Sequence, residues 1–85
     1  MGCMVNAIRP CACCGYLTVQ EEYDICPVCG WEADGVQERD PSFAGGANDM
    51  NLMTARATFR EIGATHREWL PRVRAPLPHE VPPRS

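Results

Sequence analysis

Five of the six cysteines lie between residues 11 and 29, and their spacing is typical of a metal site. A Cys-x-x-Cys-Gly-aromatic pattern occurs twice, at residues 11–16 and 26–31, and the two copies align without a gap. Two residues between the cysteines allow both sulfurs to reach one ion from a tight turn, and thiolates favour tetrahedral zinc or iron. We call each copy a knuckle, and together they predict one four-thiolate metal site.

The first knuckle contains three cysteines for two ligand positions. Alignment with the second copy places Cys13 opposite Val28, in the interior of the knuckle where no ligand is needed. Cys13 and Cys3 are then spare thiols, and Cys13 can substitute if Cys14 is lost. The predicted ligands are Cys11, Cys14, Cys26 and Cys29. Zinc is the expected metal, and iron is the alternative.

Other cysteine chemistry fits the chain less well. Disulfides persist in oxidising compartments, and the N-terminus shows neither the apolar run nor the cleavage site of a secretory signal. We therefore expect a cytoplasmic protein with no membrane span. Catalytic zinc keeps an open coordination position, whereas four cysteines close the shell, so no enzymatic activity is expected. We interpret His66 and His79 as core or surface histidines.

The elements around the knuckles predict a small α+β domain. Residues 16–19 and 23–25 alternate like half-buried strands around the polar turn 20–22, which predicts a zinc-ribbon-like hairpin with one knuckle at the base of each arm. Residues 36–39 suggest a short third strand. Breakers at residues 40–42 and 45–46 indicate an ordered loop over residues 40–49, in which Phe43 is the one apolar anchor.

An amphipathic helix is expected after this loop. Asn48, Asp49 and Asn51 offer N-caps, and the helix is closed by Pro71. Gly63 interrupts the helical pattern, so the sequence is compatible with one kinked helix or with two shorter helices. The apolar stripe recurs at intervals of three and four. Its members are Leu52, Ala55, Phe59, Ile62, His66, Trp69 and Leu70.

A chain of 85 residues forms one domain at most and buries too little surface to be stable without a staple. Residues 1–9 are expected to be a flexible lead-in, residues 10–71 the zinc ribbon with its helix, and residues 72–85 a proline-rich extended tail. A metal ion is the staple that the cysteines predict.

The charges are unevenly distributed, although the net charge is only −3. Residues 15–50 contain eight acidic residues and one arginine, whereas arginines predominate between residues 56 and 74. A modest negative charge argues against a strongly basic nucleic-acid binder. Tyr16 and Trp31 are accordingly expected to cover the knuckles, because acidic neighbours do not suit a platform for stacking bases.

Beyond the cysteines, the chain resembles the cysteine-rich CPCC proteins, which are small and mostly bacterial. The resemblance covers residues 10–63, and it departs from the family at Ala12, where the family name calls for proline. It implies a metal-binding cysteine-rich domain, and it implies no particular activity. The matching residues are 11–18, Cys26-Pro27-Val28-Cys29, Trp31-Glu32, Val36-Gln37, Asp40-Pro41, 45–48, Ala55-Arg56, Phe59 and Gly63.

Three functions follow in order of preference. The first is a structural zinc domain that serves as a protein-interaction module, with another protein as its partner. The second is electron transfer by iron in a rubredoxin-like site, where the acidic residues 21–40 would meet the redox partner. The third is nucleic-acid binding through one basic helical face formed by Arg56, Arg60 and Arg67.

Overall fold

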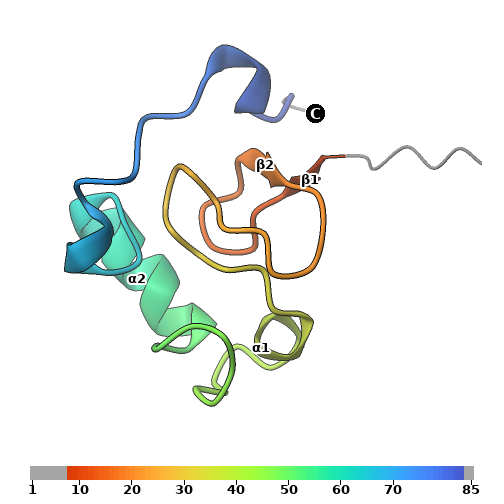
Figure 1. Ribbon diagram of the computed structural model, residues 1–85, viewed down its shortest axis with the longest axis vertical. Helices are drawn as coiled ribbons and strands as arrows, with labels where there is room; N and C mark the ends of the chain where they lie inside the picture. Colours follow the sequence, from red (N-terminus) through yellow and green to blue (C-terminus); the bar gives the residue numbers. More distant parts are fainter. Residues whose placement is uncertain (1–7, 84–85) are drawn as a thin grey trace, which may run out of the picture.

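The two knuckles occupy the centre of the molecule, with the helices arranged around them (Figure 1). The computed structural model describes residues 8–83, so the prediction that Cys3 is a spare thiol lies outside the described residues. In chain order, the elements are the strands β1 (Arg9–Pro10) and β2 (Leu17–Val19), the helices α1 (Gly35–Arg39) and α2 (Leu52–Ile62), and the 3-10 turns η1 (Arg67–Trp69) and η2 (Pro78–Glu80).

A two-stranded antiparallel sheet flanks the first knuckle. Strand β1 pairs with β2, with Arg9 opposite Val19 and Pro10 opposite Leu17. The sequence predicts β2, but the prediction that β2 pairs with residues 23–25 is wrong. Each knuckle reverses the chain by itself, so the strands that meet are the two that flank the same knuckle. Arg9, assigned above to the lead-in, is therefore part of the sheet.

The second knuckle repeats this arrangement in a shorter form. An isolated antiparallel bridge joins Ile25 to Glu32. These residues lie fifteen positions after Pro10 and Leu17, which is also the offset from Cys11 to Cys26. The internal repeat seen in the sequence is thus a structural repeat, and it extends one residue pair beyond each knuckle.

Helix α1 replaces the third strand that we expected at residues 36–39. Asp34 is its N-cap, and its carboxylate accepts hydrogen bonds from the backbone of Val36 at 2.9 Å and of Gln37 at 3.4 Å. An aspartate at this position satisfies amide groups that the first helical turn leaves unpaired. The helix is only about one turn long, so it is too short for an apolar periodicity in the sequence to predict it.

Residues 40–50 form the predicted loop, but polar side chains hold it in place. Phe43 is 39% exposed, and its ring packs on Gly45 within the loop, where a β-carbon would lie 2.7 Å from the ring. The buried side-chain amide of Gln37 donates to the carbonyls of Phe43 and Met50, both at 3.0 Å. Asn48 donates to the Gln37 side chain at 2.9 Å and to the carbonyl of Glu32 at 2.8 Å.

Helix α2 begins at the predicted cap and ends earlier than predicted. Asn51 accepts a hydrogen bond from the backbone of Thr54 at 2.8 Å. Gly63 has a φ of 87° and ends α2, so it splits the expected helix: the 3-10 turn η1 comes next, and Pro71 follows η1 and does not end α2. A left-handed residue at this position is the commonest way for a helix to end. His66, Trp69 and Leu70 therefore do not extend the stripe of α2.

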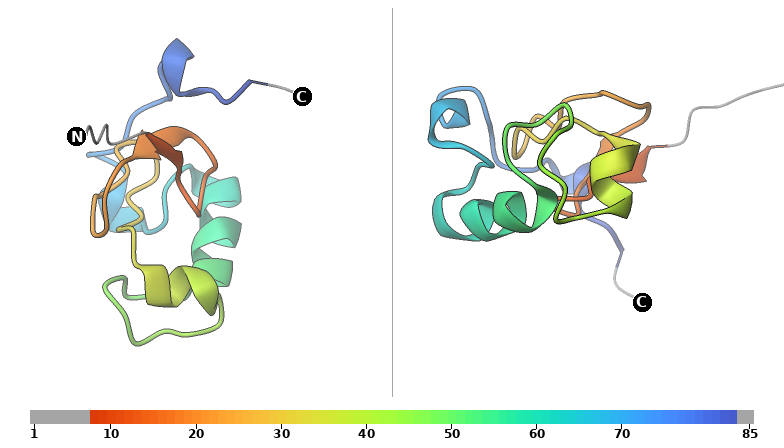
Figure 2. Two further views of the ribbon diagram at one scale, coloured as in Figure 1. Left: turned by 90° about the vertical axis from the view of Figure 1, so that its right-hand side faces the viewer. Right: turned by 90° about the horizontal axis from the view of Figure 1, so that it is seen from below.

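The chain then returns across the knuckles. After η1 it runs back along the second knuckle, and η2 finally lies against β2 (Figures 1 and 2). The tail is not extended throughout, because it contains the 3-10 turn η2. An ion pair of 2.8 Å between Arg74 and Glu80 closes this part of the chain. We call residues 64–80 the strap.

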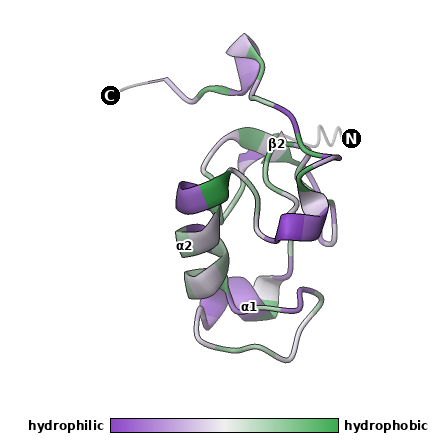
Figure 3. Ribbon diagram, turned by 90° about the vertical axis from the view of Figure 1, so that its left-hand side faces the viewer, coloured by the Kyte–Doolittle hydropathy of each residue, from purple (hydrophilic) through white to green (hydrophobic). Residues whose placement is uncertain are grey.

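The core is small and is centred on the second knuckle. Figure 3 shows that the last turn of α2 carries both strongly hydrophobic and strongly hydrophilic residues, as an amphipathic helix should. No helix in the described part of the chain is long and apolar enough to cross a membrane. The buried apolar residues that pack together are Cys11, Val19, Cys26, Val28, Cys29, Trp31, Ala33, Leu52 and Ala55. The chain is thus a small α+β protein.

Candidate metal centre

Both knuckles have the same backbone geometry. In the first, the amide of Cys11 donates to Tyr16 and the amide of Gly15 donates to Cys11, each at 2.8 Å. In the second, Cys26 donates to Trp31 at 2.9 Å and Gly30 donates to Cys26 at 2.8 Å. The two glycines have φ values of 84° and 92°. Glycine is required there because a side chain disfavours this left-handed region.

The turns bring the four predicted ligand residues together. Their sulfur atoms all lie within 4.8 Å of one another. The Cys11 and Cys29 sulfurs are 3.6 Å apart, and those of Cys14 and Cys26 are 3.7 Å apart. A regular tetrahedron with metal–sulfur bonds of about 2.3 Å has edges of about 3.8 Å. The donor set and these two edges therefore fit one tetrahedral ion.

None of the five cysteines in residues 8–83 forms a disulfide. Separations of 3.6 and 3.7 Å are also much longer than a sulfur–sulfur bond, which is about 2.05 Å. The structure therefore favours the metal interpretation over covalent pairing of the same cysteines.

Hydrogen-bond donors surround the sulfurs of the second knuckle. The amide of Val28 donates to Cys26 at 3.4 Å, and the amide of Trp31 donates to Cys29 at 3.4 Å. The Thr18 hydroxyl also donates to the Cys26 sulfur, at 2.9 Å. Such donors stabilise the ionised form of a thiol, and outer contacts of this kind orient metal ligands.

The four thiols compete for protons when no cation balances them. The pKa of Cys26 is lowered because neighbouring thiols, Cys11 foremost, donate hydrogen bonds to its sulfur. The pKa of Cys29 is raised because its thiol donates to its neighbours, again Cys11 foremost. Four thiolates at this spacing would repel one another, so full ionisation requires a bound cation.

Cys13 does not belong to the cluster of four sulfurs. It lies close enough to Cys29 to contribute to the raised pKa of that thiol, after the larger effect of Cys11. Its counterpart in the second knuckle, Val28, is 3% exposed, whereas Cys13 is only partly buried. The structure thus places a fifth thiol beside the site.

The second knuckle lies under the strap. A β-carbon on Gly30 would lie 2.7 Å from the Trp69 ring, so this ring packs directly on the turn. The amide of Thr65 donates to the carbonyl of Cys29 at 2.8 Å, and the amide of Arg74 donates to the carbonyl of Pro27 at 3.1 Å. These contacts cover the second knuckle from one side.

The first knuckle is tied to helix α2 by one side chain. Arg56 Nε donates to the carbonyl of Ala12 at 2.9 Å, across 44 residues of sequence. Ala12 is the residue that departs from the family pattern, and its carbonyl thus has a long-range partner. Arg56 is therefore engaged inside the molecule. Because α2 ends at Ile62, the predicted helical face keeps Arg56 and Arg60 but does not extend to Arg67, which lies in η1.

The aromatic residues of the two knuckles, Tyr16 and Trp31, differ in their surroundings. Trp31 is fully buried, and its indole Nε1 donates to the Glu38 carboxylate at 2.9 Å. Tyr16 is only partly buried, although it packs against the core. Glu38 also accepts from the amide of Asp34 at 3.2 Å, so α1 is fastened directly to the second knuckle. No pattern in the sequence predicts this role of Glu38.

The contacts between Gln37 and Asn48 have no signal in the sequence. Gln37 was expected in a third strand and Asn48 as a helix N-cap, and both residues match the family pattern. Gly46 is part of the same arrangement, because a β-carbon on it would lie 2.6 Å from the Gln37 side chain. The amide of Ala47, followed by those of Gln37 and Val36, lowers the pKa of Asp34 by donating to its carboxylate. These residues position α1 and the loop beside the knuckle.

The histidines have no part in the cysteine cluster. His66 Nδ1 accepts a hydrogen bond from the amide of Glu68 at 3.1 Å and thereby caps η1. His79 is exposed and lies in η2. Their arrangement agrees with our interpretation of both as histidines outside the metal shell.

Comparison with known proteins supports the resemblance seen in the sequence. The family model described as cysteine-rich CPCC matches residues 9–80, which include both knuckles, α2 and η2. A search of curated proteins finds no match. Because the family match covers most of the chain, this protein belongs to the cysteine-rich CPCC family.

Proposed function

We propose that the chain is a structural zinc domain in which Cys11, Cys14, Cys26 and Cys29 bind one Zn²⁺ ion. The observation that carries this proposal is the clustering of these four sulfurs, two of whose separations match the edge of a zinc tetrahedron. Four thiolates complete the coordination shell and leave no position for a reactive water. The role of the ion is therefore structural and not catalytic.

A structural ion supplies what the small core lacks. Zinc binding contributes about 10–16 kcal/mol in peptide models near neutral pH, which matches the folding free energy of a whole small domain. The ion would hold the two knuckles together, and the second knuckle in turn supports α1 and the strap. Loss of the ion is therefore expected to unfold all of these parts.

Metal analysis together with thermal melting tests the zinc proposal. Untagged protein should contain one zinc per chain, and removal of the metal under reducing conditions should abolish the cooperative melt seen by circular dichroism. Zinc added back should restore it. The proposal fails if metal-free, reduced protein melts like the loaded form.

Iron is the second candidate, and the hydrogen bonds to sulfur are the observation that favours it. Amide donors to thiolates tune the potential of iron–thiolate centres, and Val28 and Trp31 supply two of them. The site would then transfer single electrons. Protein purified without added metal distinguishes the two candidates, because an iron site absorbs visible light and a zinc site is colourless.

We further propose that the domain acts in the cytoplasm as an interaction module for another protein. The absence of an open metal position supports a binding role over an enzymatic one. Arg56 is partly buried and its Nε is held by the carbonyl of Ala12, so this side chain is less free to reach a phosphate, which supports a protein partner over nucleic acid. Salt-sensitive binding to random DNA or RNA would contradict this choice.

A further inference from the structure

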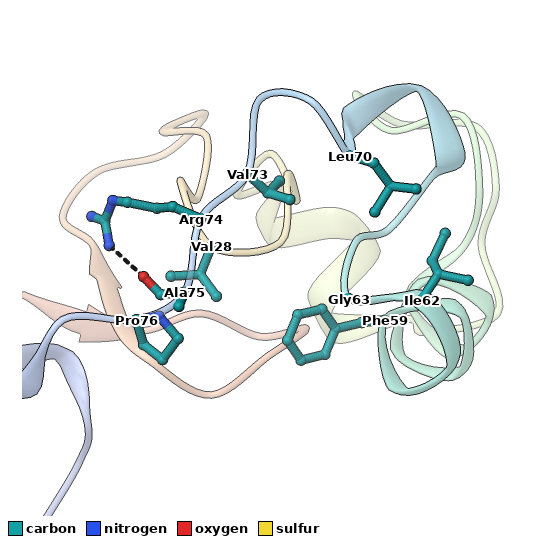
Figure 4. Close-up of a pocket in the computed structure, with 9 residues that line it drawn as sticks. All are labelled: Val28, Phe59, Ile62, Gly63, Leu70, Val73, Arg74, Ala75 and Pro76. Carbon is teal, nitrogen blue, oxygen red and sulfur yellow. Dashed lines mark hydrogen bonds between the residues drawn. The ribbon is translucent and has the colours of Figure 1, made fainter.

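An open apolar groove lies between the end of α2 and the strap. It has a volume of about 350 Å³, at the small end of the range for ligand pockets. Figure 4 shows Ile62 and Leu70 pointing towards each other across the groove, and Phe59 and Val28 pointing into it. Val73 and Pro76 complete the apolar lining.

The groove is not used by the metal site. Val28 is the one lining residue that comes from a knuckle, and every other lining residue lies between Phe59 and Pro76. Leu70 is 41% exposed, which is high for a leucine beside a core. An apolar hollow with a partly exposed leucine at its edge is the form of a site for one or two apolar side chains of a partner.

Charge decides which partner suits the groove. The segment from Phe59 to Pro76 carries four arginines, Arg60, Arg67, Arg72 and Arg74, against the two acidic residues Glu61 and Glu68. Arg74 lines the groove but is already paired with the Glu80 carboxylate at 2.8 Å, so Arg60, Arg67 and Arg72 are the arginines of this segment without an ion pair in the described structure. The Arg72 guanidinium lies 5.7 Å from the centre of the Trp69 ring. The knuckle half of the chain, by contrast, is acidic. Acidic residues in a partner are therefore attracted to this side of the molecule.

We propose that the groove binds a short acidic segment of a partner protein, in which an apolar side chain the size of leucine or phenylalanine is flanked by aspartate or glutamate. The apolar side chain enters the hollow between Leu70 and Ile62, and the flanking carboxylates meet Arg67 and Arg72 of the strap. This inference deepens the interaction role proposed above and rests on it.

A random dodecapeptide library displayed on phage tests the proposal. The zinc-loaded full chain is the bait, and the Leu70→Gln variant is used for counter-selection. We expect the enriched peptides to share one large apolar residue flanked by acidic residues. Synthetic copies should bind the Leu70→Gln variant about tenfold more weakly in fluorescence anisotropy, because the variant removes apolar contact at the edge of the groove.

The Met53→Gln variant is the matched control. Met53 is 59% exposed, lies on α2 and does not line the groove, so this variant should bind the peptides like the unaltered chain. For the charges, Arg72→Gln should weaken binding about two- to fivefold, with a loss that shrinks at high salt. Arg39→Gln makes the same change of net charge in α1 and should leave the affinity unchanged.

Several outcomes would overturn the proposal. These are the absence of enriched peptides, enrichment of basic or uncharged peptides, and equal binding to the Leu70→Gln and Met53→Gln variants. Self-association of the unaltered chain that Leu70→Gln abolishes, measured by analytical ultracentrifugation, would make a second copy the occupant. Zinc content and circular dichroism of each variant distinguish failure of this proposal from failure of the zinc proposal. A zinc-loaded, folded chain that binds no peptide contradicts only the proposal for the groove.

Discussion

The two knuckles share one backbone geometry and differ in almost everything around it. Cys26, Cys29 and Trp31 have no exposed surface, whereas Cys14 and Tyr16 in the first knuckle are only partly buried. The strap and α1 are both fastened to the second knuckle. The first knuckle contacts α2 through Arg56 and is otherwise more open.

This difference shows that the conformation of each turn is determined locally, whereas its burial is determined by distant segments. The hydrogen bonds and the left-handed glycine are local, so both copies have them. Burial depends on which distant segments return to the turn, and α1 and the strap return to the second knuckle. We therefore expect the same substitution to be more costly in the second knuckle than in the first.

Loss of a ligand should have the largest effect and should differ between the knuckles. Cys29→Ser removes a buried thiolate with no spare beside it in its own knuckle, and we expect loss of zinc and of the folded state. Cys14→Ser should retain a weaker site, because Cys13 is adjacent. Zinc competition with a chromophoric chelator measures both affinities. The combined Cys13→Ser and Cys14→Ser variant should lose the retained binding, and equal loss in all three variants would show that Cys13 does not substitute.

The two knuckle glycines provide the next largest contrast. Gly15→Ala should cost about 1 kcal/mol for its left-handed backbone alone, since a β-carbon there has nothing within 4 Å. Gly30→Ala should cost about 3 kcal/mol, because its β-carbon would also displace the Trp69 ring. Urea denaturation of the zinc-loaded variants measures both values. Equal costs would indicate that the strap does not pack on the second knuckle.

Substitutions of the knuckle aromatics Trp31 and Tyr16 should differ less in their effect on the free energy of unfolding. Trp31→Phe leaves Glu38 without its indole donor and shrinks a fully buried side chain, which should cost about 2 kcal/mol. Tyr16→Phe changes a partly exposed side chain and should cost less than about 0.5 kcal/mol. Thermal melting compares the two variants. A double-mutant cycle of Trp31→Phe with Glu38→Gln should show coupling, and simple additivity would argue against the indole contact.

Acid should weaken the strap, with the smallest effect of the four. Arg74, and then the amide of Leu77, lower the pKa of Glu80 from 4.5 to about 2. A lowered pKa in the folded state stabilises the protein above pH 4.5, and this contribution is lost as the pH falls from 4.5 towards 2. The stability difference between the unaltered chain and Glu80→Gln should therefore be present at pH 7 and smaller at pH 4, as measured by urea denaturation. Zinc content is measured at each pH, because the comparison holds only while both chains keep the ion. A difference that does not change with pH would contradict the ion pair.

Local features were the ones that sequence reasoning could predict. The alignment of the two cysteine patterns identified the four clustered residues, because each turn is specified by its own cysteines and glycine. The Asn51 cap was predicted for the same reason. Pairing of β1 with β2 was missed because Arg9 and Pro10 give little strand signal alone. Helix α1 was missed because it is one turn long and is held by polar contacts of Glu38 with Trp31 and of Gln37 with the loop, which leave no apolar periodicity in the sequence.

The repeat of fifteen residues also bears on how the chain folds. Each knuckle closes through contacts within six residues, so each forms with a small entropic cost. Only the eleven residues between Cys14 and Cys26 must then be closed to bring the two cysteine pairs together. Closing a loop of about ten residues takes on the order of 10–100 ns. The search for the metal-binding arrangement is therefore short, and the slower steps are left to the strap, whose partners in the second knuckle are about 35–50 residues away along the chain.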